Sequence, residues 1–248
     1  SEASDTLERW TKVQMSWCSL ESVFTGGDIA KSLPMDAKRF GKVDKEWAKI
    51  MNKSSDVKLV IPCCENETLK TSLPTMYQEL EKCQKALDGY LEAKRNKFPR
   101  FYFVSNPGLL TILSQGSDPL SMNDHYEKVF DALEFMDHNP SDKTIIEKMH
   151  GSGGVGHEVL TFVTPVKAVG NIEDWLSALL KRMQLTLKEL TRTAAGQINA
   201  MGANDVSQLR PFVDRSIAQL ALLGIQIMWT TDTQGALDEC RVKKNAMR

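Results

Sequence analysis

The first part of the chain carries apolar residues at intervals of three and four, which places them on one face of an α-helix. The first such run spans residues 6–24 and ends at a pair of glycines. A second run starts at Leu33-Pro34, where proline is tolerated in the first helical turn, and reaches the polar stretch 52–56. The pattern therefore predicts two amphipathic helices. The apolar run 57–61 that follows fits either a strand or a loop.

The longest periodic segment covers residues 67–97 and predicts a helix of ~30 residues, about 45 Å long. Such a helix could form a coiled-coil seam, but it holds too few heptads, so packing inside a helical bundle is favoured. Pro99 ends the segment. Asn106-Pro107 then predicts a new helix, with asparagine as the N-cap and proline at the first helical position.

Residues 122–136 continue the helical spacing and predict one more helix before the pattern changes. Two short runs, 144–149 and 158–164, are then rich in β-branched residues and flanked by turn residues. The glycine-rich segment 151–156 lies between them. Two strands around such a turn predict a β-hairpin.

Helical spacing resumes after Asn171, a predicted N-cap, and a last helical region is predicted over 211–237. We therefore expect a mainly α fold, an elongated multi-helix bundle arm with one inserted β-hairpin. The expected parts are an N-terminal helical part (1–140), the hairpin insert (141–169) and a C-terminal helical part (170–248). No internal repeat is visible in the sequence.

Composition narrows the classes of protein to which the chain can belong. Its 248 residues carry 31 Lys and Arg against 32 Asp and Glu, a net charge of -1. Nucleic-acid binders and polybasic membrane modules need a large positive surplus, so we expect neither nucleic acid nor membrane as a partner. No apolar run approaches the ~20 residues of a membrane span, and no secretory signal is visible. The five scattered cysteines fit a reducing compartment.

The glycine-rich segment matches the dinucleotide-binding fingerprint at Gly151, Gly153 and Gly156. That fingerprint needs a helix after the glycines, because the pyrophosphate binds at the helix N-terminus. Here a strand and then Pro165 follow. We interpret these three glycines and Gly154 as the tip of the hairpin, where a contact could form. The chain contains no Gly-Lys-Ser or Gly-Lys-Thr phosphate loop.

The sequence also contains no convincing metal-binding or catalytic motif. Cys63 and Cys64 are adjacent, without the Cys-x-x-Cys spacing of zinc sites. His150 and His157 could face each other across the hairpin, but four ligands do not converge. We therefore predict no metal site, no cofactor site and no catalytic residue in this chain.

The end of the long helix is rich in basic and aromatic residues. The basic cluster Lys94, Arg95, Lys97 and Arg100 follows several acidic residues, which favours a solvated helix end over a nucleic-acid patch. The next residues are candidates either for a joint that bends or for the core, and their aromatic content favours the core: Phe98, Pro99, Arg100, Phe101 and Tyr102.

The run from Tyr90 to Asn106, YLEAKRNKFPRFYFVSN, resembles the central signature of the dynein heavy chain linker. The opening W-x-x-V-Q-x-x-W pattern from Trp10 and the late Q-I-x-W-T pattern from Gln226 are similar to the same family. The motifs follow in the family's order over nearly the whole chain, and their amino-acid sequences resemble axonemal dyneins more than cytoplasmic dyneins. The hairpin tip departs from the acidic Glu-Gly-Glu of the family, which puts any contact made by that acidic tip in doubt.

The resemblance implies a mechanical role. It implies an arm, the N-terminal region 2 or linker, that crosses the AAA+ ring of the same heavy chain and bends and straightens with ATP turnover to drive microtubule-based movement. ATP and Mg would bind in the parent ring, and microtubules would be contacted only through the parent motor. The implied location is the cytoskeleton, in a ciliary or flagellar axoneme or otherwise the cytoplasm. The alternative is a static helical scaffold of a large cytoskeletal protein, which a fixed-period repeat would favour.

Overall fold

The chain forms two compact units, Ser1–Asp118 and Pro119–Arg248. The computed structural model describes residues 2–25, 28–116, 118–151, 158–201 and 206–242. Helices dominate both units, and the second also contains a small antiparallel sheet, which confirms the mainly α fold with an inserted β element. No helix within the described ranges is long and apolar enough to cross a membrane. The three-part division at residues 140 and 169 stays a prediction.

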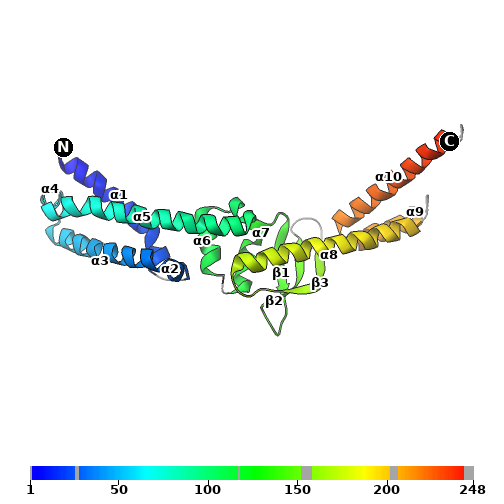
Figure 1. Ribbon diagram of the computed structural model, residues 1–248, viewed down its shortest axis with the longest axis horizontal. Coiled ribbons are helices and arrows are strands. Elements are labelled where there is room, and N and C mark those ends of the chain that lie inside the picture. The colour runs from blue at the N-terminus through cyan, green and yellow to red at the C-terminus, as the bar shows by residue number, and fades with distance from the viewer. Residues whose placement is uncertain (1, 26–27, 117, 152–157, 202–205, 243–248) are drawn as a thin grey trace. The chain divides into compact units, whose positions relative to one another are not determined.

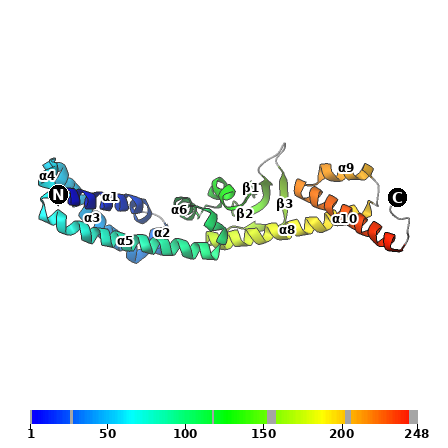
Figure 2. The ribbon, with the colours of Figure 1, turned by 90° about the horizontal axis from the view of Figure 1, so that it is seen from above.

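The N-terminal unit is built on three long helices, α1 (Glu2–Phe24), α3 (Pro34–Val57) and α5 (Glu67–Lys97). They lie alongside one another (Figures 1 and 2) and are in contact pairwise. Shorter elements connect and follow them: α2 (Asp28–Ser32), α4 (Val60–Cys64), the 3-10 helix η1 (Pro99–Phe103) and α6 (Asn106–Ser114). The predicted packing of the long segment inside a bundle is confirmed.

One apolar stripe along α5 forms the centre of this bundle. Its buried residues recur at intervals of three and four: Leu69, Leu73, Met76, Leu80, Cys83, Leu87 and Leu91. Helix α1 contributes Val13 and Leu20 to the same core, and α3 contributes Phe40 and Trp47. A complementary apolar face on each helix is thus what binds the three together, because each stripe leaves water only by packing on the other two.

Three predicted details of this unit are corrected by the structure. Helix α3 continues through the polar stretch to Val57 and is capped by Lys58, whose φ of 62° is left-handed. The run 57–61 is not a strand: Lys58 and Leu59 form a short loop, and α4 begins at Val60 and adds one helical turn. The N-cap of α6 is Ser105, whose hydroxyl accepts the Gly108 N–H at 3.4 Å.

The C-terminal unit begins with irregular helical turns, the 3-10 helix η2 (Pro119–His125) and α7 (Tyr126–Val129). Three antiparallel strands follow in the order β1-β2-β3, namely β1 (Leu133–His138), β2 (Ile145–Gly151) and β3 (Val159–Lys167). Strand β3 packs against α8 (Ile172–Ala200), and α8 in turn contacts α10 (Ala218–Val242) (Figure 1). Helix α9 (Val206–Arg215) precedes α10.

The predicted helix over 122–136 was wrong, because only α7 is an α-helix there and β1 occupies the last four residues. Ala132 has a positive φ of 56°, which breaks the helical path, and β1 then pairs with β2. The side chain of Asn123 substitutes for a neighbouring strand on Met136, accepting its N–H at 3.0 Å and donating to its carbonyl at 3.4 Å. Long-range strand pairing therefore overrides a local helical spacing. The two predicted hairpin strands are present as β2 and β3.

The helices that follow differ from the prediction in one respect. Asn171 is the N-cap residue of α8 as predicted, although its side-chain amide donates to Asp174 at 3.1 Å and makes no cap bond. The last helical region is divided into α9 and α10, where a single helix over 211–237 was expected. The short break between them lets Phe212 of α9 pack against α8 and α10.

Candidate functional site

The chain turns sharply where α5 ends, and this corner contains the five candidate joint residues. Phe98 is extended, with φ of -130° and ψ of 91°, and Pro99 begins the 3-10 turn η1. Phe98 and Phe101 are buried and form an edge-to-face pair with ring centroids 5.0 Å apart. Pro99 and Tyr102 lie on the surface, and Arg100 is half-buried. The buried aromatic pair therefore forms the inside of the corner.

Arg95, in the last turn of α5, bonds the two sides of this corner together. Its Nε donates to the carbonyl of Phe101 at 3.4 Å, and its Nη2 donates to the carbonyl of Val104 at 3.2 Å. The same Nη2 donates to Oδ1 of Asn106, the first residue of α6, at 2.7 Å. One guanidinium thus links α5, η1 and α6, as its planar set of donors allows.

This role corrects the interpretation of the basic cluster as a solvated helix end. Arg95 is half-buried and bonded to three acceptors, so it is part of the corner. Nothing in the sequence distinguishes Arg95 from its neighbours, since Lys94 and Lys97 are also basic. Only the fold places the carbonyls of residues 101 and 104 within reach of this one side chain.

On the outer side of the corner, Tyr102 folds back along α5. Its hydroxyl donates to Oε1 of Glu92 at 2.5 Å and lies 3.2 Å from Oδ1 of Asn96. The hydrogen bond to the Glu92 carboxylate raises the pKa of the Tyr102 phenol, with smaller contributions from burial and from the Glu92 charge. Polar contacts therefore hold η1 to α5 on its outer face, while the phenylalanine pair holds it on the inner face.

The glycine-rich hairpin tip is described only at its first residue. Gly151 is the last residue of β2, and its N–H donates to the carbonyl of Glu158 at 2.9 Å. Gly153, Gly154, Gly156 and His157 lie outside the described residues, so a contact made by this tip stays a prediction. The base of the hairpin is tied to the helices, because Oε1 of Glu158 accepts the Ala218 N–H at the start of α10 at 2.6 Å.

His150 is engaged within the sheet. Its ring stacks on Phe135 of β1 with centroids 4.0 Å apart, and its Nε2 lies 2.9 Å from Oδ2 of Asp137. Both partners come from β1, whose first four residues the sequence interpretation assigned to a helix. Across the described ranges, no three His, Cys, Asp or Glu side chains gather in a way that could hold a metal ion.

A second, fully described turn joins β1 and β2 and was missed in the sequence. In Figure 1 it is the green loop that extends below the sheet, away from α8. Oδ1 of Asn139 accepts the N–H groups of Ser141 and Asp142 at 2.8 and 3.2 Å. Oδ1 of Asp142 then accepts both the N–H and the hydroxyl of Thr144, and these bonds lower the pKa of Asp142. Asn and Asp at these positions are typical turn formers, which was the available signal.

The amino-acid sequence of this chain is similar to those of known proteins. The family described as "Dynein heavy chain, N-terminal region 2" matches residues 1–194. Dynein axonemal heavy chain 5 of Rattus norvegicus is 42% identical over 249 aligned residues, which cover 100% of this chain and 7% of that protein.

More distant relatives align over a similar extent. The dynein gamma chain of the flagellar outer arm of Chlamydomonas reinhardtii is 40% identical over 100% of this chain and 5% of its own length. The cytoplasmic dynein heavy chain of Dictyostelium discoideum is 33% identical over 93% of this chain and 5% of its own length. The chain thus spans only a small fraction of the curated relatives it matches.

Proposed function

Because this chain belongs to the dynein heavy chain family, in its N-terminal region 2, we propose that it is the mechanical linker segment of a motor. In this role it crosses the AAA+ ring of its own heavy chain and changes between bent and straight forms as ATP is turned over. The ring would hold ATP and Mg, and the motor as a whole would contact microtubules. The segment itself would transmit force and perform no chemical step.

The observation that carries this proposal is the braced corner at the end of α5. A segment that transmits force must resist bending along its helices and at the turns between them. Helix α5 has 31 residues and packs along both α1 and α3, which supports its stiffness. At its end, Arg95 and the Phe98–Phe101 pair connect it to α6 through both polar and apolar contacts. Well-packed elements of this kind switch between discrete arrangements and do not deform smoothly.

The proposal also includes the cellular location of the motor and a role for the β2–β3 hairpin. Similarity over the whole of this chain to segments of axonemal and flagellar outer-arm heavy chains supports an axonemal motor of a cilium or flagellum. The glycine-rich tip between β2 and β3 is proposed to contact another part of the motor, since its strands are anchored on α8 and at Ala218. A firmly anchored base would let the tip transmit a displacement to the helices.

The test separates force transmission from ATP turnover in the parent heavy chain. Arg95→Lys keeps the charge but cannot reproduce the three-acceptor geometry, because an ammonium is a single compact donor group. We expect microtubule gliding to slow several-fold while microtubule-stimulated ATP turnover stays within about twofold of the parent. Arg9→Lys, at an exposed position of α1, is the matched control and leaves both unchanged. Gliding at the parent's speed in the Arg95→Lys motor would contradict the proposal.

A further inference from the structure

One face of α3 carries a row of lysines that form no ion pair with the described residues of the chain. Lys42, Lys45, Lys49 and Lys53 follow one another at intervals of three and four residues. At 100° per residue, these positions share a narrow strip along the helix. All four side chains are exposed, on the side of α3 that faces a hollow beside α5. The strip is therefore a continuous basic surface.

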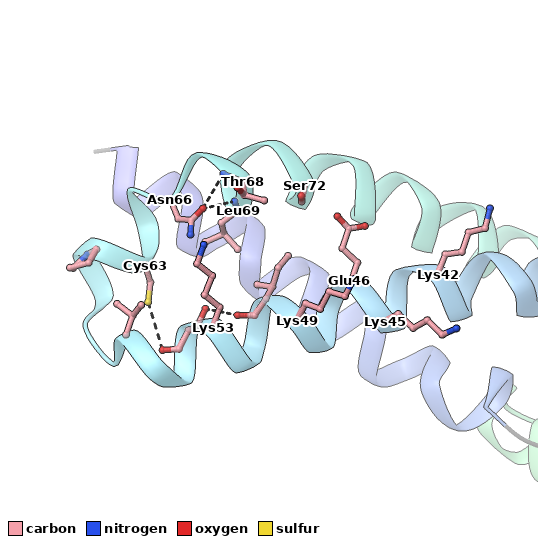
Figure 3. Close-up of a pocket in the computed structure, with 14 residues that line it drawn as sticks. Lys42, Lys45, Glu46, Lys49, Lys53, Cys63, Asn66, Thr68, Leu69 and Ser72 are labelled. Carbon is pink, nitrogen blue, oxygen red and sulfur yellow. Dashed lines mark hydrogen bonds between the residues drawn. The ribbon is translucent and has the colours of Figure 1, made fainter.

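These lysines form one wall of a cavity of about 490 Å³ between α3, α4 and the start of α5. Figure 3 shows the lysines on α3, with the polar residues Asn66, Thr68 and Ser72 on the other side of the hollow. Apolar side chains line its interior, including Ile50, Val57, Pro62 and Leu69. We call this cavity, with its four lysines, the α3 lysine groove. Its size lies within the range of cavities that bind ligand groups, about 300–1,000 Å³.

The charge of the groove is not neutralised within the part of the chain that the structure describes. None of its four lysines has an ion-pair partner there. Glu46 is the one acidic residue in its lining, and its carboxylate extends toward α5 (Figure 3).

Three other lysines of the same bundle are paired with carboxylates. Lys12 lies 2.7 Å from Glu8, Lys70 lies 2.6 Å from Glu2, and Lys82 lies 2.6 Å from Glu79. Like charges four residues apart, such as Lys45–Lys49 and Lys49–Lys53, destabilise a helix. The repulsion between these lysines therefore destabilises α3, and no ion pair in the described chain compensates for it. This is expected of a surface that binds a partner.

The spacing of the lysines indicates the form of the ligand. Lys45, Lys49 and Lys53 are separated by four residues, a rise of about 6 Å each. Alternate side chains of an extended peptide are about 6.6 Å apart, so carboxylates at every second position match the row. The apolar interior suits a hydrophobic side chain and is a poor environment for phosphates of a nucleic acid. A flat lipid surface could reach the lysines but could not fill the cavity.

We propose that the α3 lysine groove binds an acidic segment of a partner protein, which pairs its carboxylates with the lysines and places an apolar side chain in the cavity. This inference stands apart from the proposed force-transmitting role, because it rests only on the charge and shape of the groove. The site lies within the N-terminal unit and needs no other part of the chain.

The experiment measures binding of a fluorescein-labelled nine-residue peptide to the full 248-residue chain. The peptide has glutamate at alternate positions and one central leucine, and a second peptide has serine in place of that leucine. The groove variant is Lys45→Gln/Lys49→Gln/Lys53→Gln. The control variant, Lys12→Gln/Lys82→Gln/Lys85→Gln, removes the same charge from exposed positions of the same bundle. Far-UV circular dichroism checks that both variants retain the helicity of the parent.

We expect saturable binding that is about tenfold weaker in the groove variant and unchanged in the control variant, since each exposed pair contributes modestly. The serine peptide should bind several-fold more weakly, and raising salt from about 0.05 M to about 0.5 M should weaken binding through screening. Equal losses in both lysine variants would overturn the proposal, as would absence of saturable binding. Binding to phosphatidylserine vesicles that needs the groove lysines, without peptide binding, would overturn it in favour of a lipid.

Discussion

Two helix junctions of this protein, one in each unit, are held by different forces. At the corner after α5, a buried phenylalanine pair is crossed by polar bonds from Arg95. At the α9–α10 junction, Phe212 packs against Ala194 and Ile198 of α8 in an apolar cluster. There the close approach depends on Gly224 of α10, because a Cβ at that position would lie 2.8 Å from Cζ of Phe212.

The difference has a mechanical consequence. Contacts in an apolar cluster depend on shape, so they resist compression and tolerate small sliding movements. The guanidinium bonds at the corner depend on direction, so they resist rotation of α6 about the end of α5. We therefore expect the corner to be the junction that would transmit a change of angle, and the C-terminal junction to be the one that would set a distance. Substitutions at each can test this contrast, from the largest effect to the smallest.

The largest effect is expected at the inside of the corner. Phe101→Ala removes a ring that is 0% exposed, and such truncations cost about 3–5 kcal/mol through lost burial and the cavity left behind. Phe103→Ala, two residues away in the same 3-10 helix, removes a ring that is 82% exposed and should change the free energy of unfolding by less than about 0.5 kcal/mol. Urea denaturation measures both. Similar values for the two variants would mean that the pair Phe98–Phe101 is not the core of the corner.

A smaller loss is expected when the polar bonds are removed. Arg95→Ala leaves the carbonyls of Phe101 and Val104 without their donor, and hydrogen bonds from a charged group contribute about 1.5–3 kcal/mol. Because Arg95 is half-buried and water can replace part of this, we expect a loss of about 2 kcal/mol in urea denaturation. Asn106→Ala removes only one of the three acceptors and should cost less. A larger loss for Asn106→Ala than for Arg95→Ala would contradict the assignment of Arg95 as the central residue.

The sequence predicted the elements of the N-terminal unit better than those of the C-terminal unit, and the reasons are physical. The 3.6-residue period and the prolines gave the helices of the N-terminal bundle, because amphipathic helices are specified by local spacing. Strand β1 was missed because its pairing with β2 is long-range, and Leu133 and Met136 fit a helical spacing equally well. The corner residues Phe98 and Phe101 could be singled out, whereas the role of Arg95 depends on carbonyls that only the folded turn presents. The lysines of α3 could be read from the sequence, but the hollow beside them could not.

A matched pair of glycines tests the C-terminal junction. Gly224→Ala must move the rigid ring of Phe212, and such overpacking costs about 1–3 kcal/mol, partly offset by the better helix propensity of alanine. We expect a net loss of about 1 kcal/mol. Gly235→Ala, in the same helix with nothing within 4 Å of the new Cβ, should gain about 0.5–1 kcal/mol. Equal gains in both variants would show that α10 does not need its close approach to α9.

The smallest effect on stability is expected on the outer side of the corner, where Tyr102 is 52% exposed and water can replace its hydrogen bonds. Its titration is the sharper test, because the Glu92 carboxylate that accepts the hydroxyl proton raises the pKa of the phenol above its ordinary value of 10.0. Tyr102 should therefore stay protonated to a higher pH than a free tyrosine. Glu92→Gln should return its pKa toward the ordinary value, followed by NMR of the tyrosine Cζ carbon. Tyr102→Phe identifies the signal. If Glu92→Gln leaves the midpoint unchanged, the hydroxyl of Tyr102 is not bonded to Glu92, and this carboxylate does not help to hold the outer side of the corner.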